Sequence, residues 1–196
     1  MFFMNLVPFG MNITNLLTGI GDPVLALGFV AFVFLLIALP LSFWAVGTTS
    51  TSTTGRFLIA LANLFLTAQL IFRWWQSGHF PISNLYESLC FLAWACTLTQ
   101  LFVERSWPSP LVSAATTPMA LIAVAFASFA LPERLQQASP LVPALRSSWL
   151  VMHVSVIMCS YAALLVGSLL SLAVVLIDRD QAFEIRSSSM GIGGFR

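Results

Sequence analysis

The sequence predicts an all-α membrane protein, a polytopic bundle of about five transmembrane helices. Hydrophobic residues make up 59% of the 196 positions and charged residues only 8%, against about 25% charged residues in an ordinary soluble domain. A soluble domain of this size still exposes about 30% of the surface of its unfolded chain, so lipid must be the solvent for most of these side chains. Several segments also reach the roughly 20 apolar residues with which a helix crosses a bilayer.

The charge pattern excludes nucleic acid as a partner. The net charge is +1, and all the basic residues are arginines scattered between apolar segments. Nucleic-acid binding needs basic residues clustered on one face or along one helix, and no such cluster exists here.

The first two spans follow an N-terminal extramembrane segment, residues 1–23, which has no positively charged start and so does not resemble a cleaved signal peptide. The five-helix region is predicted at 24–177. Its first span, 24–46, contains Pro40, which a helix inside a bundle tolerates as a kink. The second span, 57–75, ends in an arginine and two tryptophans, typical of an anchor at the membrane interface.

Three further spans are predicted from their apolar runs, at 85–103, 111–131 and 148–177. A short loop, 76–84, precedes the first of these. A polar segment, 132–147, precedes the last and has room for a short interfacial helix at 133–138. The charged and then Ser/Gly-rich residues 178–196 are typical of a flexible tail.

The arginines predict the orientation of this multi-pass protein. Five of them lie in segments that five spans place on one side, at positions 56, 105, 179, 186 and 196. Arg134 and Arg146 lie on the other side, with Arg73 at a helix edge. Because cytoplasmic loops carry the excess of arginine, the N-terminus and loops 76–84 and 132–147 are expected outside the cytoplasm, in the periplasm or the thylakoid lumen. The membrane itself would be a plasma or a thylakoid membrane.

His153 is the ionisable side chain that lies furthest inside a predicted span. Such groups cost roughly 2.5–3.5 kcal/mol at a helix centre on insertion scales and mark functional positions. Helical geometry places His153 within about 40° of a line of small and polar residues, Ser160, Gly167 and Ser171, and Trp149 lies one turn before it. The histidine could donate a hydrogen bond to a neighbouring helix, or it could be an axial ligand of haem iron.

The segment 78–89, Gly-His-Phe-Pro-Ile-Ser-Asn-Leu-Tyr-Glu-Ser-Leu, is predicted to start the third span. Pro81 favours an extended backbone, Asn84 suits the N-cap, and Glu87 falls at the third helical position of a capping box. Glu87 could therefore be only a cap at the membrane interface. A cap explains two of these residues and leaves the rest of the segment unexplained.

Cys90, Cys96 and Cys159 all fall inside apolar runs. Because no CxxC pair is present, they are predicted to be small buried residues rather than a redox or metal pair.

The segments 78–89, 149–155 and 160–165 resemble the CcsA-type family of system II cytochrome c biogenesis proteins of cyanobacteria, chloroplasts and some other bacteria. The resemblance covers about residues 57 to 178. It implies a protein that receives haem, holds it near the outer face of the membrane and presents it to apocytochrome c, whose CxxCH cysteines bond to the haem vinyl groups.

The resemblance also implies roles for particular residues and partners. His153 would be an axial ligand of a transiently held b-type haem, and Trp149 would contact the haem face. Asn84, Tyr86 and Glu87 would shape the outer rim of the site. The partners would be a second synthase subunit with a large outer domain and apocytochrome c.

This sequence lacks the family's tryptophan-rich segment with its Trp-Asp-Pro core, and also the histidines that follow it. The chain is therefore expected to be an incomplete, N-terminal part of a cytochrome c synthase that is not active alone. Two alternatives stay open: a b-type haem electron-transfer subunit, and a structural membrane subunit without catalytic function. The first would need paired histidines, such as His79 and His153 around one haem. A transporter would show an inverted repeat, and the sequence shows none.

Overall fold

The computed structural model describes residues 22–48, 53–137 and 147–190, and these fold into helices without any strand. In chain order they are α2 (Pro23–Thr48), α3 (Thr53–Ser77), α4 (Leu85–Ser106), α5 (Pro110–Ala125), a π-helical turn (Phe126–Ala130), α6 (Glu133–Gln136) and α7 (Ser148–Met190). Within the described residues, five helical stretches are long and apolar enough to cross a membrane. The predicted class, an all-α polytopic membrane protein, is confirmed.

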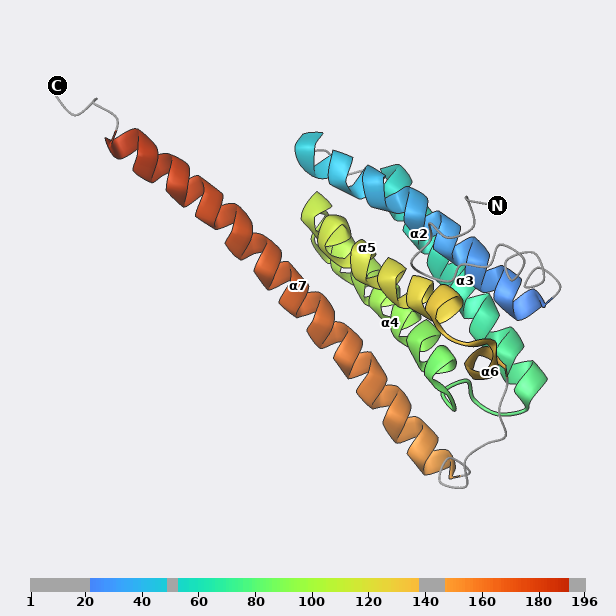
Figure 1. Ribbon diagram of the computed structural model, residues 1–196. Helices are drawn as coiled ribbons and strands as arrows, with labels where there is room; N and C mark the ends of the chain where they lie inside the picture. The colour runs from blue at the N-terminus through green and yellow to red at the C-terminus, as the bar shows by residue number, and fades with distance from the viewer. Residues whose placement is uncertain (1–21, 49–52, 138–146, 191–196) are drawn as a thin grey trace, which may run out of the picture.

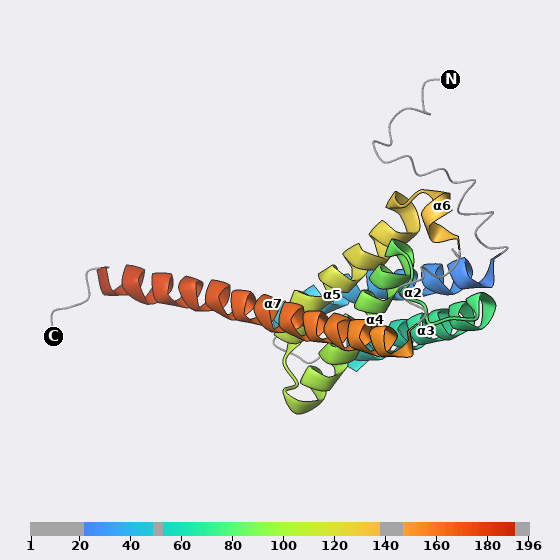
Figure 2. The ribbon, with the colours of Figure 1, turned by 90° about the horizontal axis from the view of Figure 1, so that it is seen from below.

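The helices α2 to α5 form a bundle, and α7 lies along one side of it (Figure 1). α2 packs against α3 and α5, while α4 packs against α3, α5 and α7. The bundle core consists largely of small and branched side chains, which let the helices approach closely: Ala31, Leu35, Ala62, Leu66, Ala93, Ala120, Ala123 and Val124. Seen after a quarter turn, α7 extends well beyond the bundle at its C-terminal end (Figure 2).

The fourth span begins and ends at recognisable signals. Ser109 caps α5 by accepting a hydrogen bond from the amide of Leu111, and Pro110 occupies the first helical position, where its missing N–H costs nothing. The helix continues past Pro118 and closes in the π-helical turn Phe126–Ala130. Pro132 then prevents further helix at Leu131, which has an extended backbone.

The last helix is longer than expected from the sequence. A flexible tail was expected from residue 178, but α7 continues to Met190. Residues 178–190 contain neither glycine nor proline, so nothing in them opposes helix once the preceding span has started it.

The cysteine expectation is confirmed for two of three residues. Cys90 and Cys96 on α4 are buried, whereas Cys159 is exposed. On α7, Ala162 and Val166 pack against Ala95 and Cys96 of α4, and Cys159 is not part of that cluster.

Two helical glycines provide a matched test of this packing. A Cβ atom on Gly28 of α2 would lie 3.0–3.2 Å from the amide atoms of Gln69, whereas a Cβ on Gly167 of α7 would meet nothing within 4 Å. Gln69 cannot easily move, because its amide nitrogen donates to the Tyr86 hydroxyl at 2.7 Å. Gly28→Ala should therefore lower the free energy of unfolding by about 1–3 kcal/mol.

Gly167→Ala should raise that free energy by up to about 1 kcal/mol, because alanine is the better helix former. Both variants can be compared by denaturant unfolding in one detergent. Equal effects of the two substitutions would contradict the close α2–α3 approach.

Candidate functional site

The segment 78–89 turns the chain from α3 into α4. Gly78 has φ +70°, a conformation that glycine adopts without strain. Asn84 is the N-cap of α4, as predicted, and its side-chain oxygen accepts a hydrogen bond from the amide of Glu87 at 2.9 Å. Replacing such a cap by alanine typically costs about 1 kcal/mol, so Asn84 contributes to where α4 begins.

The carboxylate of Glu87 does more than a capping box requires. One oxygen accepts from the amide of Ser83 at 2.8 Å, and the other lies 3.0 Å from Nε of Arg73 on α3. The side chains of Arg73 and Glu87 are only 5% and 1% exposed. Arg73, expected to be part of an interfacial anchor, instead turns inward because a buried carboxylate faces it, while Trp74 and Trp75 remain exposed.

The same residues hold α6 and the residue that follows it. Arg73 donates from Nη2 to the carbonyl of Gln136 at 2.6 Å. Asn84 donates from Nδ2 to the carbonyl of Gln137 at 3.1 Å. The side chain of Gln136 in turn donates to the carbonyl of Leu131 at 2.8 Å. We call Arg73, Asn84, Glu87 and Gln136 the polar latch; it joins α3, α4 and α6 at one end of the bundle.

Tyr86 lies next to the polar latch, on the side towards the interior of the bundle. It is 1% exposed, its hydroxyl accepts from Nε2 of Gln69, and the guanidinium of Arg73 lies 5.7 Å from its ring centroid, a cation–π distance. Tyr86 and Glu87 thus lie in the interior, while Asn84 is half-buried at the surface. A direct contribution of the two buried residues to an exposed rim finds no counterpart in this geometry.

His153 and Trp149 lie on α7, away from the polar latch residues. His153 is exposed and Trp149 is 78% exposed. Nine residues of helix separate His153 from Ala162, which places them about 180° apart. Because Ala162 packs on α4, the imidazole faces away from the bundle. No described residue hydrogen-bonds it, so the alternative of a bond to a neighbouring helix is not formed within the described part of the chain.

The polar latch and the pair His153 and Trp149 nevertheless lie at the same end of the molecule. α3 ends and α4 begins there, and α6 and the first turn of α7 lie at the same end (Figure 1). The structure therefore joins Asn84, Tyr86 and Glu87 through Arg73 and Gln69. It leaves His153 and Trp149 as a separate exposed pair.

His79 is the other histidine at this end. It is half-buried, and its Nδ1 lies 3.1 Å from the hydroxyl of Ser83 and 3.3 Å from the carbonyl of Phe80. One ring nitrogen is thus engaged within its own loop, whereas the described residues form no hydrogen bond with the exposed His153.

The side chains allow only a limited form of metal binding. Among the described residues, no three His, Cys, Asp or Glu side chains gather into a group that could hold an ion. A lone imidazole can still ligate iron that brings its own in-plane ligands, as haem does. The indole of Trp149, one helical turn away, offers a flat apolar surface beside it.

Fold and site together define a multi-pass helical membrane protein with an exposed histidine and tryptophan near one end of its last span, at the same end of the bundle as a buried polar latch. The profile of the family described as "Cytochrome C assembly protein" matches residues 82–192, more than half of the chain. The chain therefore belongs to the cytochrome c assembly protein family. The matched range includes every predicted site residue, but neither Arg73 nor Gln69.

Curated relatives agree with this assignment. A protein of Prochlorococcus marinus (strain MIT 9303) named "Cytochrome c biogenesis protein CcsA" is 73% identical over 188 residues, covering 96% of this chain and 59% of the relative. One of the same name from Synechococcus sp. (strain CC9605) is 75% identical over 173 residues, covering 88% of this chain and 57% of the relative. The chain thus spans less than two thirds of the length of these relatives.

Proposed function

We propose that this chain handles haem for attachment to apocytochrome c during system II cytochrome c maturation. The observation that carries the proposal is the exposed pair His153 and Trp149 on the outward face of α7. Family membership indicates cytochrome c assembly as the process. The outward face of α7 offers an accessible imidazole beside an aromatic surface. Haem is the cargo of this reaction rather than a resident cofactor.

His153 would be an axial ligand of the iron of a b-type haem that is held transiently. Trp149 would pack against the haem face. Asn84, Tyr86 and Glu87 would act as positioning residues. Asn84 bonds to the carbonyl of Gln137. Tyr86 and Glu87 both contact Arg73, which bonds to the carbonyl of Gln136. The role of the protein would be ligation and orientation, while the redox chemistry belongs to haem.

The partners and the location are part of the same proposal. The chain would work in a cytochrome c synthase with a second subunit that carries a large outer domain, and apocytochrome c would be the acceptor. The polar latch and the start of α7 would face the lumen or periplasm of a thylakoid or plasma membrane. A low-spin haem has two axial ligands, so this chain alone would supply one of them and would not be an active synthase.

Haem titration tests the proposal directly. The chain, purified anaerobically in detergent, should bind reduced haem saturably at one haem per chain, because one exposed imidazole is available. The shift of the Soret band measures binding. Haem that partitions without saturation, as it does into empty micelles, would instead support a structural membrane subunit.

A further inference from the structure

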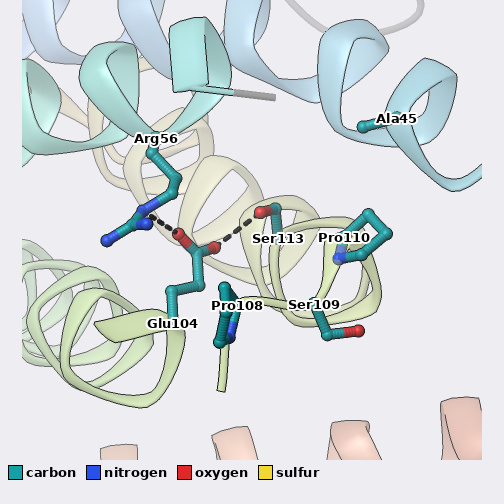
Figure 3. A pocket seen from close by; sticks show the side chains of 7 residues that line it. All are labelled: Ala45, Arg56, Glu104, Pro108, Ser109, Pro110 and Ser113. Atoms are coloured by element: carbon teal, nitrogen blue, oxygen red, sulfur yellow. Dashed lines mark hydrogen bonds and ion pairs between the residues drawn. The ribbon is translucent and has the colours of Figure 1, made fainter. Parts of the chain in front are cut away.

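A second polar cluster lies at the opposite end of the bundle, where α2 and α4 end and α3 and α5 begin. It surrounds a shallow pocket, open to the exterior, whose cavity volume is about 10 Å³, the space of one water-sized group. The residues that line it are Ala45, Arg56, Glu104, Pro108, Ser109, Pro110 and Ser113 (Figure 3). Typical small-molecule pockets enclose roughly 300–1,000 Å³. This one therefore has room for one small polar group rather than for a haem.

Glu104 of α4 is the buried wall of the pocket, at 1% exposure. Its Oε1 accepts from the hydroxyl of Ser113 at 2.5 Å and from Nε2 of Gln100 at 3.0 Å. Its Oε2 lies 3.3 Å from Nε of Arg56, an ion-pair contact. That N–H is not aligned with the oxygen, and no described residue donates a hydrogen bond to Oε2.

The amide oxygen of Gln100, one turn before Glu104, is a second buried acceptor without a donor among the described residues. Buried polar atoms in folded proteins nearly always have a hydrogen-bond partner. Gln100 does not line the pocket, so Oε2 of Glu104 is the open acceptor that a guest with an O–H or N–H donor can reach.

Arg56 requires that the guest also accept a hydrogen bond. Its side chain is 41% exposed, and a guanidinium carries five N–H donors, of which the contact with Glu104 involves only one. The guest must therefore donate to Glu104 and accept from Arg56 within a single small group. Figure 3 shows the two side chains meeting at the pocket, with Ser113 on the far side of the carboxylate.

Charge selects among the groups that both donate and accept. The Arg56–Glu104 pair is neutral as a unit, so an ammonium placed at Glu104 would be repelled by the nearby guanidinium. A phosphate placed at Arg56 would be repelled by the carboxylate. A hydroxyl donates to one and accepts from the other without either repulsion.

The position of the pocket identifies the source of such hydroxyls. Four membrane spans end or begin around it, and the neighbours of two lining residues, Trp44 and Trp107, are 74% and 73% exposed. Exposed tryptophans at the ends of spans mark the headgroup layer of the bilayer. We propose that this pocket binds the uncharged, hydroxyl-bearing headgroup of a membrane lipid, through Glu104 and Arg56.

Native mass spectrometry of the chain released from lipid nanodiscs tests this assignment. The nanodiscs would contain phosphatidylcholine with equal fractions of a monoglycosyl diacylglycerol and phosphatidylglycerol. The chain should retain one glycosyl lipid with at least a tenfold preference over each phospholipid. Glu104→Gln and Arg56→Gln should each reduce this preference at least tenfold, because each replaces a charged partner of the hydroxyls.

Arg105→Gln is the matched control, because Arg105 neighbours Glu104, is exposed and does not line the pocket. It should leave the preference unchanged. Arg56 is on the half-exposed side of the pair, so Arg56→Gln keeps the test available should Glu104→Gln fail to fold. Preferential retention of phosphatidylglycerol, retention of no lipid above phosphatidylcholine, or an equal loss in Arg105→Gln would each overturn the proposal.

Discussion

Replacing His153 with alanine is expected to weaken the binding of reduced haem to this chain by at least about tenfold, which corresponds to 1.4 kcal/mol. The substitution removes the exposed imidazole that we propose as the iron ligand. It should disturb the fold little, since His153 points away from the α4 contact of Ala162 and Val166. Soret titrations of wild type and His153→Ala, with circular dichroism to confirm equal helix content, give the measurement.

His79→Ala is the matched control for this experiment. The Nδ1 of His79 is engaged by Ser83 and Phe80 within its own loop, so its loss should change haem affinity by less than about twofold. Imidazole added to His153→Ala should restore part of the spectrum by taking the vacant axial position. If His79→Ala is as damaging as His153→Ala, a bis-histidine site of the electron-transfer type replaces the single-ligand proposal. An unchanged titration in His153→Ala would exclude this residue as a ligand.

Local patterns predicted much of this fold because the forces that act on them are local. Apolar runs of membrane-spanning length located five helices, and Asn84, three residues before Glu87, fixed the start of α4. The end of α7 was misplaced because charged residues can continue a helix outside the membrane. Charge alone does not mark a helix end when neither glycine nor proline interrupts the chain.

Side-chain contacts between helices could not be predicted from the sequence. Arg73 was predicted to face the interface, because a single chain does not reveal that Glu87, 14 residues later, lies opposite it in the folded bundle. Gln69 gave no signal at all, although its amide bonds to Tyr86 and packs on Gly28. The Arg56–Glu104 pair was missed for the same reason: both residues looked like ordinary charges at span ends.

The outward direction of His153 could be derived in part. The line through His153, Ser160, Gly167 and Ser171 was recognised as one face of a helix, but which face packs on the bundle was open. The structure resolves this through the opposite face, where Ala162 and Val166 meet α4. Small residues thus lie on both sides of α7, and only the contact partners distinguish them.

Removal of one partner from the buried Arg73–Glu87 pair is expected to destabilise the protein strongly. Breaking such a pair leaves an uncompensated charge away from water and typically costs 3–5 kcal/mol. Arg73→Met should reach this range, because the Glu87 carboxyl group, 1% exposed, would lose its cationic partner and the carbonyl of Gln136 would lose its donor. Glu87→Gln should cost less, since an amide oxygen can still accept from the amide of Ser83.

The double variant Arg73→Met, Glu87→Gln measures the interaction between Arg73 and Glu87 apart from their contacts with other residues. It removes both charges, so it should be more stable than Arg73→Met alone and leave a coupling energy of at least about 1 kcal/mol in the double-mutant cycle. Equilibrium unfolding in mixed detergent gives the four free energies. Hydrogen exchange at the α6 amides should rise in Arg73→Met, because the arginine no longer holds Gln136.

Arg105→Met provides the comparison, since an exposed arginine away from such contacts should change stability by no more than about 0.5 kcal/mol. Arg73→Met and Arg105→Met remove the same charge and differ only in where the guanidinium lies. Similar losses in both variants, or strictly additive effects of the Arg73 and Glu87 substitutions, would show that the latch does not hold this end of the bundle. A large loss confined to Arg73→Met, with increased exchange in α6, would show that α3 holds α6 at this end of the bundle.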